Sequence, residues 1–166
     1  MSPSRTDIFE QAVMGRPNYG PLRMSLYRLA PSLMVCSDYL DGNLCGMYID
    51  ELETIVIDRR LPLDVKRCVL VHELVHWVRA DSQCGGYQEI KVRQIAAEAL
   101  IDRKRYAQVE CMYEGCSAAM AEELGVTQEV VDDYKSLLSI KKGSTMSAAG
   151  QWSSLFDGYG YRVIAS

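Results

Sequence analysis

The order of hydrophobic and polar positions divides the chain into a helical start, a short β part and a long helical remainder. Apolar residues at helical spacing predict helices over residues 4–15 and 22–30, which the turn-rich run RPNYGP separates. Runs rich in apolar and β-forming residues then predict three strands, at residues 33–40, 44–50 and 54–60. The short turn DGN joins the first two runs, and this favours antiparallel neighbours in a small meander.

A helix over residues 61–79 is predicted next, and its sequence is apolar on nearly every side. This pattern is typical of a helix buried between a sheet and other helices. After a polar loop at residues 80–87 the helical spacing resumes, with a break expected near Asp102 and a helix end at Gly125. We therefore predict one α+β domain over residues 1–140, in which a small three-stranded antiparallel or mixed sheet packs on a mostly helical part.

The end of the chain and the composition narrow the choice of function. Residues 141–166 are rich in Gly and Ser and lose the helical pattern, so we expect a C-terminal tail outside the domain. A formal net charge of -4 gives no reason to expect a basic surface that would bind nucleic acid.

No apolar run approaches the roughly 18–20 residues of a membrane span, and the N-terminus lacks a signal-peptide pattern. The six cysteines then indicate reduced thiols, and we expect a cytoplasmic protein.

Both histidines of the chain stand in the run VLVHELVHWV, at positions 72 and 76. Residues four apart on a helix are neighbours on one face, so His72 and His76 can bind one zinc ion. Glu73 flanks them, close enough to take a proton from the attacking water. Without a metal, each buried imidazole would need another polar partner in an apolar setting. The motif HExxH therefore favours a zinc hydrolase.

A catalytic zinc site usually has three protein ligands, and no further histidine is available. Four acidic residues are candidates for the third position: Asp81, Glu89, Glu98 and Glu110. Glu89 begins a helix whose stripe of Val92, Ala96 and Ala99 would let that helix approach the first one closely. Spacing favours Glu89 and leaves Glu98 as the main alternative.

The run from Ile55 to Asp102 resembles the ImmA/IrrE family of metallo-endopeptidases. IVIDRRLPLDVKRCVLVHELVHW is similar to the strand, connection and HExxH helix of the family, and EIKVRQIAAEALID to its second motif, E-x-x-A-N-x-F-A-x-x-L-L-x-P. The resemblance implies a zincin-like domain and places a metal-binding glutamate at Glu89. Val92, Arg93 and Ile95 stand where the family usually has Ala, Asn and Phe.

The resemblance also implies a function. Members cleave a helix-turn-helix transcriptional repressor at one bond, often within a prophage, another mobile element or a stress regulon, and they use one zinc ion per chain. Glu73 would be the catalytic base. The donor that stabilises the oxyanion stays open among five residues: Tyr48, Tyr87, Arg93, Tyr106 and Tyr113. We expect an extended substrate to pair with the edge of the sheet.

Two other functions compete with proteolysis. The segment AMAEELGVTQEVVDDYKSLL has the form of a DNA-binding helix-turn-helix, but its second helix carries three acidic residues and one basic residue, Lys135. Phosphates would repel such a helix, so we expect no direct nucleic-acid partner. The second alternative is a metal-binding interaction module of a paired regulatory or toxin–antitoxin system that does not cut its partner. An intact Glu73 favours chemistry over this alternative.

Overall fold

The computed structural model of the chain describes residues 3–80 and 86–143. The helices and strands in these ranges are α1 (Arg5–Val13), α2 (Tyr19–Leu29), β1 (Met34–Asp38), β2 (Gly46–Ile49), the 3-10 helix η1 (Asp50–Leu52), β3 (Thr54–Asp58), α3 (Leu63–Arg79), α4 (Tyr87–Leu100), α5 (Arg103–Met112), α6 (Ser117–Leu124) and α7 (Gln128–Gly143). None of these helices is long and apolar enough to cross a membrane. The predicted α+β class is confirmed.

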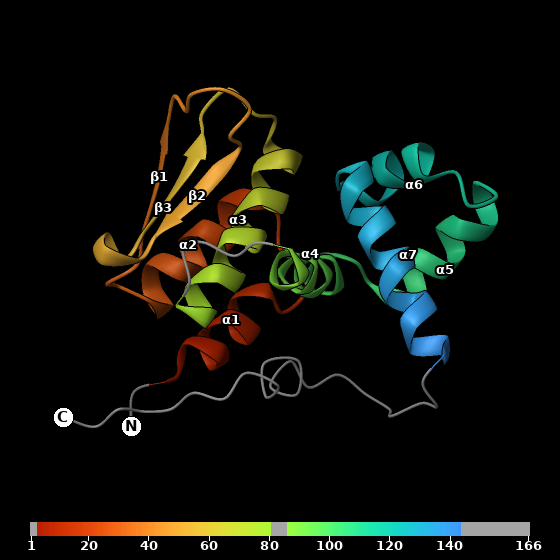
Figure 1. The fold of residues 1–166 in the computed structure, drawn as a ribbon, viewed down its shortest axis with the longest axis horizontal. Coiled ribbons are helices and arrows are strands. Elements are labelled where there is room, and N and C mark those ends of the chain that lie inside the picture. The colour runs from red at the N-terminus through yellow and green to blue at the C-terminus, as the bar shows by residue number, and fades with distance from the viewer. Residues whose placement is uncertain (1–2, 81–85, 144–166) are drawn as a thin grey trace.

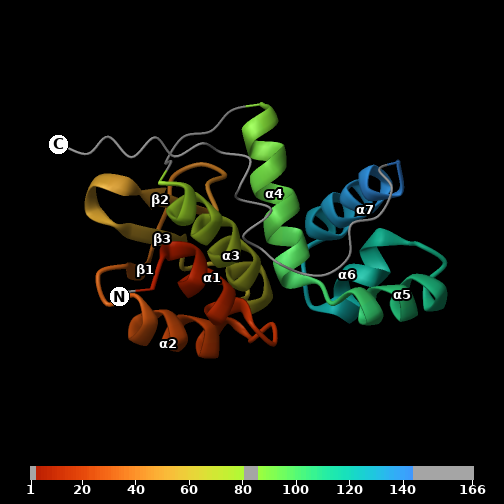
Figure 2. The ribbon, with the colours of Figure 1, turned by 90° about the horizontal axis from the view of Figure 1, so that it is seen from below.

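Helix α4 lies between two parts of the molecule (Figure 1). The sheet and helices α1 to α3 lie on one side of it, and helices α5 to α7 lie on the other (Figures 1 and 2). Helix α4 packs against α3 from the first part and against α7 from the second. The division into a domain over residues 1–140 and a tail stays a prediction, since α7 continues to Gly143 and the later residues lie outside the described ranges.

The sheet is mixed, and the predicted meander is wrong. Strand β3 is central, parallel to β1 and antiparallel to β2, so the first two strands are not neighbours. The reason is burial: β3 has Ile55 and Ile57 fully buried, whereas β1 is half-buried or exposed along its length. Strand β3 has the most buried apolar residues and therefore occupies the centre of the sheet. The connection over residues 39–45 crosses from β1 at one edge to β2 at the other.

Local signals fix several helix ends. Ser4 caps α1 through a capping box, because its Oγ accepts from the Asp7 N–H at 3.1 Å and its own N–H donates to the Asp7 carboxylate at 2.9 Å. Asp102 caps α5 by accepting from the Arg105 N–H at 2.9 Å, which confirms the predicted break. Gly125 ends α6 with a φ of 62°. Helix α2 begins earlier than predicted, at Tyr19, since the first turn of a helix tolerates Pro21.

Helix α3 forms the centre of the core. Its fully buried face includes Leu70, Leu74, Val75 and Trp77, which pack among the apolar residues of the sheet, α1, α2 and α4. The stripe with the two histidines is less buried than this face: Val65, Val69 and His72 are half-buried. Of the two histidines, His76 is buried and His72 is half-buried at the border of the core.

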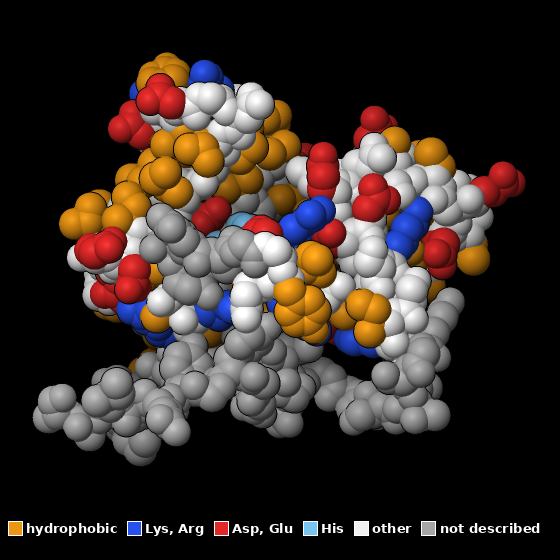
Figure 3. Space-filling model, viewed as in Figure 1, with side chains coloured by type: hydrophobic (Ala, Val, Ile, Leu, Met, Phe, Trp, Pro, Cys, Tyr) orange, Lys and Arg blue, Asp and Glu red, His pale blue; other side chains and the backbone are white. Residues whose placement is uncertain are grey.

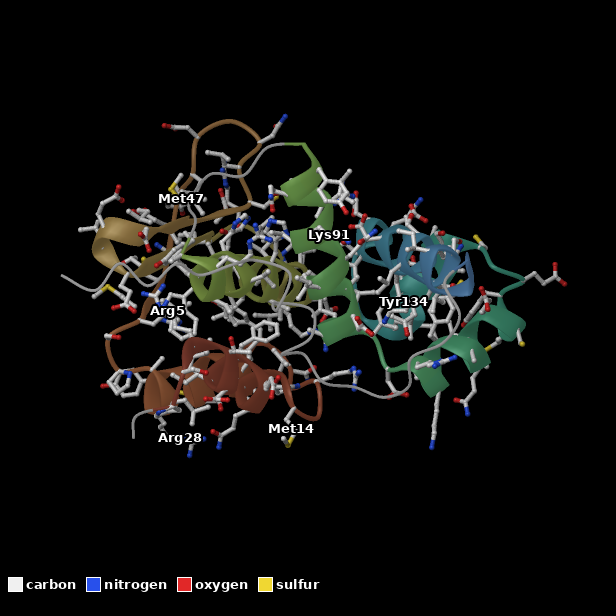
Figure 4. All side chains as sticks on the ribbon, turned by 60° about the horizontal axis from the view of Figure 1, so that its bottom comes forward. Arg5, Met14, Arg28, Met47, Lys91 and Tyr134 are labelled. Atoms are coloured by element: carbon white, nitrogen blue, oxygen red, sulfur yellow. The ribbon has the colours of Figure 1, made fainter. Side chains whose placement is uncertain are left out.

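A polar junction ties the C-terminal end of α3 to the start of the chain. The Arg5 guanidinium donates to the Trp77 carbonyl oxygen at 2.8 Å and to Glu53 Oε1 at 3.1 Å. The Trp77 indole N–H donates to the same Glu53 oxygen at 3.2 Å, and Arg5 lies 5.2 Å from the Trp77 ring centroid. Arg5 lies between α1 and the sheet (Figure 4). One carboxylate thus joins α1, the turn before β3 and α3.

We predict that Glu53→Ala lowers the free energy of unfolding by about 2 kcal/mol, because two donors lose a charged acceptor. Urea denaturation followed by circular dichroism measures this loss. Glu51→Ala is the matched control, since Glu51 is exposed in the same turn, and it should change stability by less than about 0.5 kcal/mol. Equal losses in the two variants would mean that the junction does not stabilise the fold.

Candidate metal centre

Two packed helices bring three possible metal ligands together. His72 and His76 lie one turn apart on α3, and Glu89 lies in the first turn of α4. The predicted stripe of Val92, Ala96 and Ala99 is buried, and α3 and α4 are in contact. Small side chains on this stripe permit the close approach that carries the Glu89 carboxylate to the histidines.

The separations of the three side chains fit a small tetrahedral metal ion. The two histidine Nε2 atoms are 3.3 Å apart, His72 Nε2 is 3.2 Å from Glu89 Oε1, and His76 Nε2 is 3.6 Å from Glu89 Oε2. Two ligands that each bind zinc at 2.0–2.1 Å in a tetrahedral site lie about 3.4 Å apart. Two imidazoles and one carboxylate are also a ligand set that zinc takes in catalytic sites. These three residues could therefore hold a metal ion.

The three candidate ligands are only partly covered by the described residues around them. Figure 3 shows a histidine side chain between acidic side chains, with the hydrophobic surface over the sheet on one side and a basic side chain on the other. The side chain of His76 is 9% exposed, that of His72 is 25% exposed and that of Glu89 is 35% exposed. The His76 side chain is thus held within the core, while those of His72 and Glu89 are partly exposed to solvent.

Glu73 is buried beside the histidines. Only 7% of it is exposed. Burial raises the pKa of Glu73, while the two neighbouring histidines and the backbone N–H of Tyr48 on β2 act in the opposite direction. A carboxylate with a raised pKa beside three candidate metal ligands can accept a proton and later return it.

His72 is also electrostatically tied to the acidic groups around it. Burial alone would lower the pKa of His72, but the bond to Glu89 and the charges of Glu73 and Glu89 outweigh burial and raise it. A proton on His72 must leave before this imidazole can bind a metal ion.

The structure distributes the five oxyanion candidates over different places. The Tyr48 hydroxyl donates to Asp50 at 2.6 Å, and burial together with this bond raises the pKa of Tyr48 to about 12. The Tyr106 hydroxyl donates to Glu110 at 2.9 Å, and that of Tyr113 donates to Glu123 at 3.2 Å, both in the part of the molecule formed by α5 to α7.

The other two oxyanion candidates lie on α4 with Glu89. Tyr87 is 68% exposed at the start of the helix, with its ring 5.4 Å from Lys91 Nζ. Arg93 lies one turn beyond Glu89, and its guanidinium is bound at 2.9 Å by both oxygens of Asp133 on α7. The charge of Arg93 acts on His72. By position, Arg93 is thus associated with the metal centre.

Of the other carboxylates that could have been the third ligand, two have different partners. Glu98 pairs with Lys141 at 2.5 Å, and Glu110 accepts the Tyr106 hydroxyl. Asp81 lies outside the described residues. Among the residues that the structure describes, the group of His72, His76 and Glu89 is the one with metal-ligand geometry.

Sequence reasoning missed three contributors to the site. The Tyr48 backbone N–H acts on the pKa of Glu73, Gly46 lets β2 approach α3, and the Asp133 carboxylate binds Arg93. The glycine carried a signal, because a glycine inside a strand often marks a close approach of another element. Tyr48 and Asp133 gave no such signal in the sequence. A backbone N–H has no residue pattern, and Asp133 lies 40 residues from its partner Arg93.

The model of the peptidase M78 family, described as the IrrE N-terminal-like domain, matches residues 35–133. The chain belongs to the ImmA/IrrE metallopeptidase family. The match includes α3 and α4, which carry the three candidate metal ligands. Neither a curated protein nor a solved structure matches the chain significantly. Membership shows a metallopeptidase-like domain.

We predict that the purified protein binds about one zinc ion per chain and that His76→Ala abolishes this binding. Glu89→Ala should weaken it by more than the roughly 10–100-fold typical of a lost outer-shell contact. Isothermal titration of the metal-free protein with Zn²⁺ measures both effects. Glu98→Ala on the same helix is the control and should bind as the native chain does. A native-like affinity in Glu89→Ala would assign the third ligand elsewhere.

Zinc affinity should fall on acidification, because a proton on His72 competes with the metal. The pKa of His72 is raised in the metal-free protein, so the proton stays bound to a higher pH than on a free imidazole. The loss of affinity on lowering the pH should therefore begin at a higher pH than for a free imidazole. Zinc titrations at a series of pH values test this. An affinity that does not change until well below the pKa of free imidazole would contradict it.

Proposed function

We propose that the chain is a zinc-dependent endopeptidase. The observation that carries this proposal is the position of Glu73, a buried carboxylate next to three side chains with the spacing of a zinc site. A purely structural zinc usually has four protein ligands, whereas three ligands beside an acid–base group are typical of hydrolysis. Family membership supports the same reaction class.

Each residue has a distinct role in the proposed reaction. His72 and His76, as neutral imidazoles, and Glu89, as a carboxylate, would hold the ion. Zinc, when bound, supplies Lewis acidity toward the scissile carbonyl and the attacking water. Glu73 accepts the proton of the water and delivers it to the leaving amine, and its raised pKa suits a group that must do both.

Arg93 is the oxyanion donor that we favour. It follows Glu89 by one helical turn, so both side chains lie on the same face of α4. Asp133 binds its Nε and Nη2 atoms, which fixes the plane of the guanidinium and leaves the Nη1 donors outside that pair. An arginine oriented in this way can stabilise negative charge on a carbonyl oxygen.

The substrate that we propose is a helix-turn-helix transcriptional repressor, in keeping with the family resemblance. An extended segment of it would pair with β2, because β2 is an edge strand next to Glu73. The alternative is an interaction module that binds zinc and a regulatory partner without cutting it. Glu73 separates the two, since a binding module does not need an acid–base group.

Glu73→Gln should reduce cleavage by about 10²–10⁴-fold, the usual contribution of a general acid–base group. The test incubates the zinc-loaded protein with a native lysate of the cells that produce it and identifies new protein N-termini by mass spectrometry. We expect a small set of new termini, from DNA-binding proteins, that is absent with Glu73→Gln.

Glu51→Gln is the control, because Glu51 is exposed and remote from the ligands in the sequence. Zinc content must be measured for each variant, so that lost metal is not mistaken for lost chemistry. New termini that persist in Glu73→Gln would contradict the role of Glu73. A native protein that binds zinc, produces no new termini and retains a partner would support the interaction module.

A further inference from the structure

Helix α4 carries a cation one turn beyond the third candidate metal ligand. Glu89 and Arg93 stand four residues apart with the acidic residue first, which is the arrangement that favours an ion pair along one helix. The other positions three or four residues from Glu89 in the sequence carry Gly85, Gly86 and Val92. Arg93 is therefore the cation on α4 that is placed to pair with Glu89.

Such a pair would compete with a metal ion for the same carboxylate. The Glu89 oxygens lie 3.2 Å from His72 Nε2 and 3.6 Å from His76 Nε2, so they face the space between the three candidate ligands. A carboxylate that binds a guanidinium in a bidentate pair uses both of its oxygens. Pairing with Arg93 would therefore draw Glu89 away from the histidines and bring a positive charge closer to the centre.

In the structure, Arg93 is bound by Asp133 on α7. Arg93 Nε donates to one oxygen of this carboxylate at 2.9 Å, and Nη2 donates to the other, also at 2.9 Å. Two parallel bonds to a planar group fix the direction of the side chain as well as its distance. The Arg93 side chain is 43% exposed, so packing leaves it room to turn, and the pair with Asp133 decides where it points.

Asp133 can hold Arg93 because its own helix is fixed. Val131 and Tyr134, on either side of Asp133 in the sequence, are 0% and 4% exposed. The ring centroid of Tyr134 lies 4.8 Å from that of Tyr106 on α5, and α7 packs against α4. The short carboxylate side chain of Asp133 is thus presented to α4 by a helix that the core holds in place.

We propose that Asp133 is a positioning residue for the metal centre: it binds Arg93 and so keeps the Glu89 carboxylate available to the metal ion. The inference rests on the zinc-binding part of the proposed function and does not depend on peptide cleavage. It gives the helical part formed by α5 to α7 a share in zinc binding, although the three candidate ligands lie on α3 and α4.

The test is a cycle of single and double variants in which zinc affinity is measured by titrating the metal-free full chain with Zn²⁺. Asp133→Asn should bind zinc about 5-fold more weakly, because Arg93 is released to pair with Glu89. Arg93→Gln should bind zinc at least as tightly as the native chain. The double variant Asp133→Asn/Arg93→Gln should bind zinc as Arg93→Gln does, because the competing cation is gone.

Asp132→Asn is the matched control. It removes the same charge from the next residue of α7, where the carboxylate is exposed and accepts a hydrogen bond from the Ser117 hydroxyl at 2.6 Å. Its zinc affinity should stay within about 2-fold of the native value. Circular dichroism of each variant shows whether the helices remain folded, so that lost structure is not mistaken for a lost contact.

An equal loss of zinc affinity on Asp133→Asn with and without Arg93 would overturn the proposal, because Asp133 would then act on the metal by its charge alone. Arg93→Gln provides a test that needs no change in α7. A clearly weaker affinity in this variant would also overturn the proposal, since Arg93 would then support Glu89 instead of competing for it.

The native chain separates this inference from the proposed function. If the native chain binds no zinc, the metal centre fails, and the role of Asp133 fails with it. If the native chain binds zinc and a folded Asp133→Asn variant binds it equally well, the metal centre stands and the role of Asp133 is wrong.

Discussion

The burial of α3 is the constraint on which the rest of the structure depends. Its apolar faces are covered by the sheet, by α1 and α2 and by α4, so the helix has little freedom to move. Polar groups on such a helix must either reach an opening or find partners inside. His72 lies at the partly exposed side of the helix near Glu89, and Glu73 is buried beside the two histidines.

The sequence predicted the local parts of the molecule well. HExxH placed two histidines on one helix face, and the small residues after Glu89 indicated a close helix pair; both depend on spacing within a single element. The order of the strands could not be predicted from the turn between the first two. It depends on which strand has both faces covered, and Ile55 and Ile57 show their burial only when α3 is in place.

Arg93 illustrates how a change in one helix is matched by another. The family pattern usually has Asn at this position, and a longer cation there would alter the charge next to His72. Asp133 on α7 binds the guanidinium through two contacts at 2.9 Å and offsets part of that charge. The pair also connects α7 to the metal centre, so the far helical part of the molecule takes part in the surroundings of the site.

The edge position of β2 has a consequence for how this protein meets other chains. An edge strand presents unpaired N–H and C=O groups, which can join the strand of a neighbouring molecule. Strand β2 is only four residues long, so it offers a neighbouring chain few such groups. A short edge of this kind limits unwanted pairing between sheets but leaves room for one short extended segment.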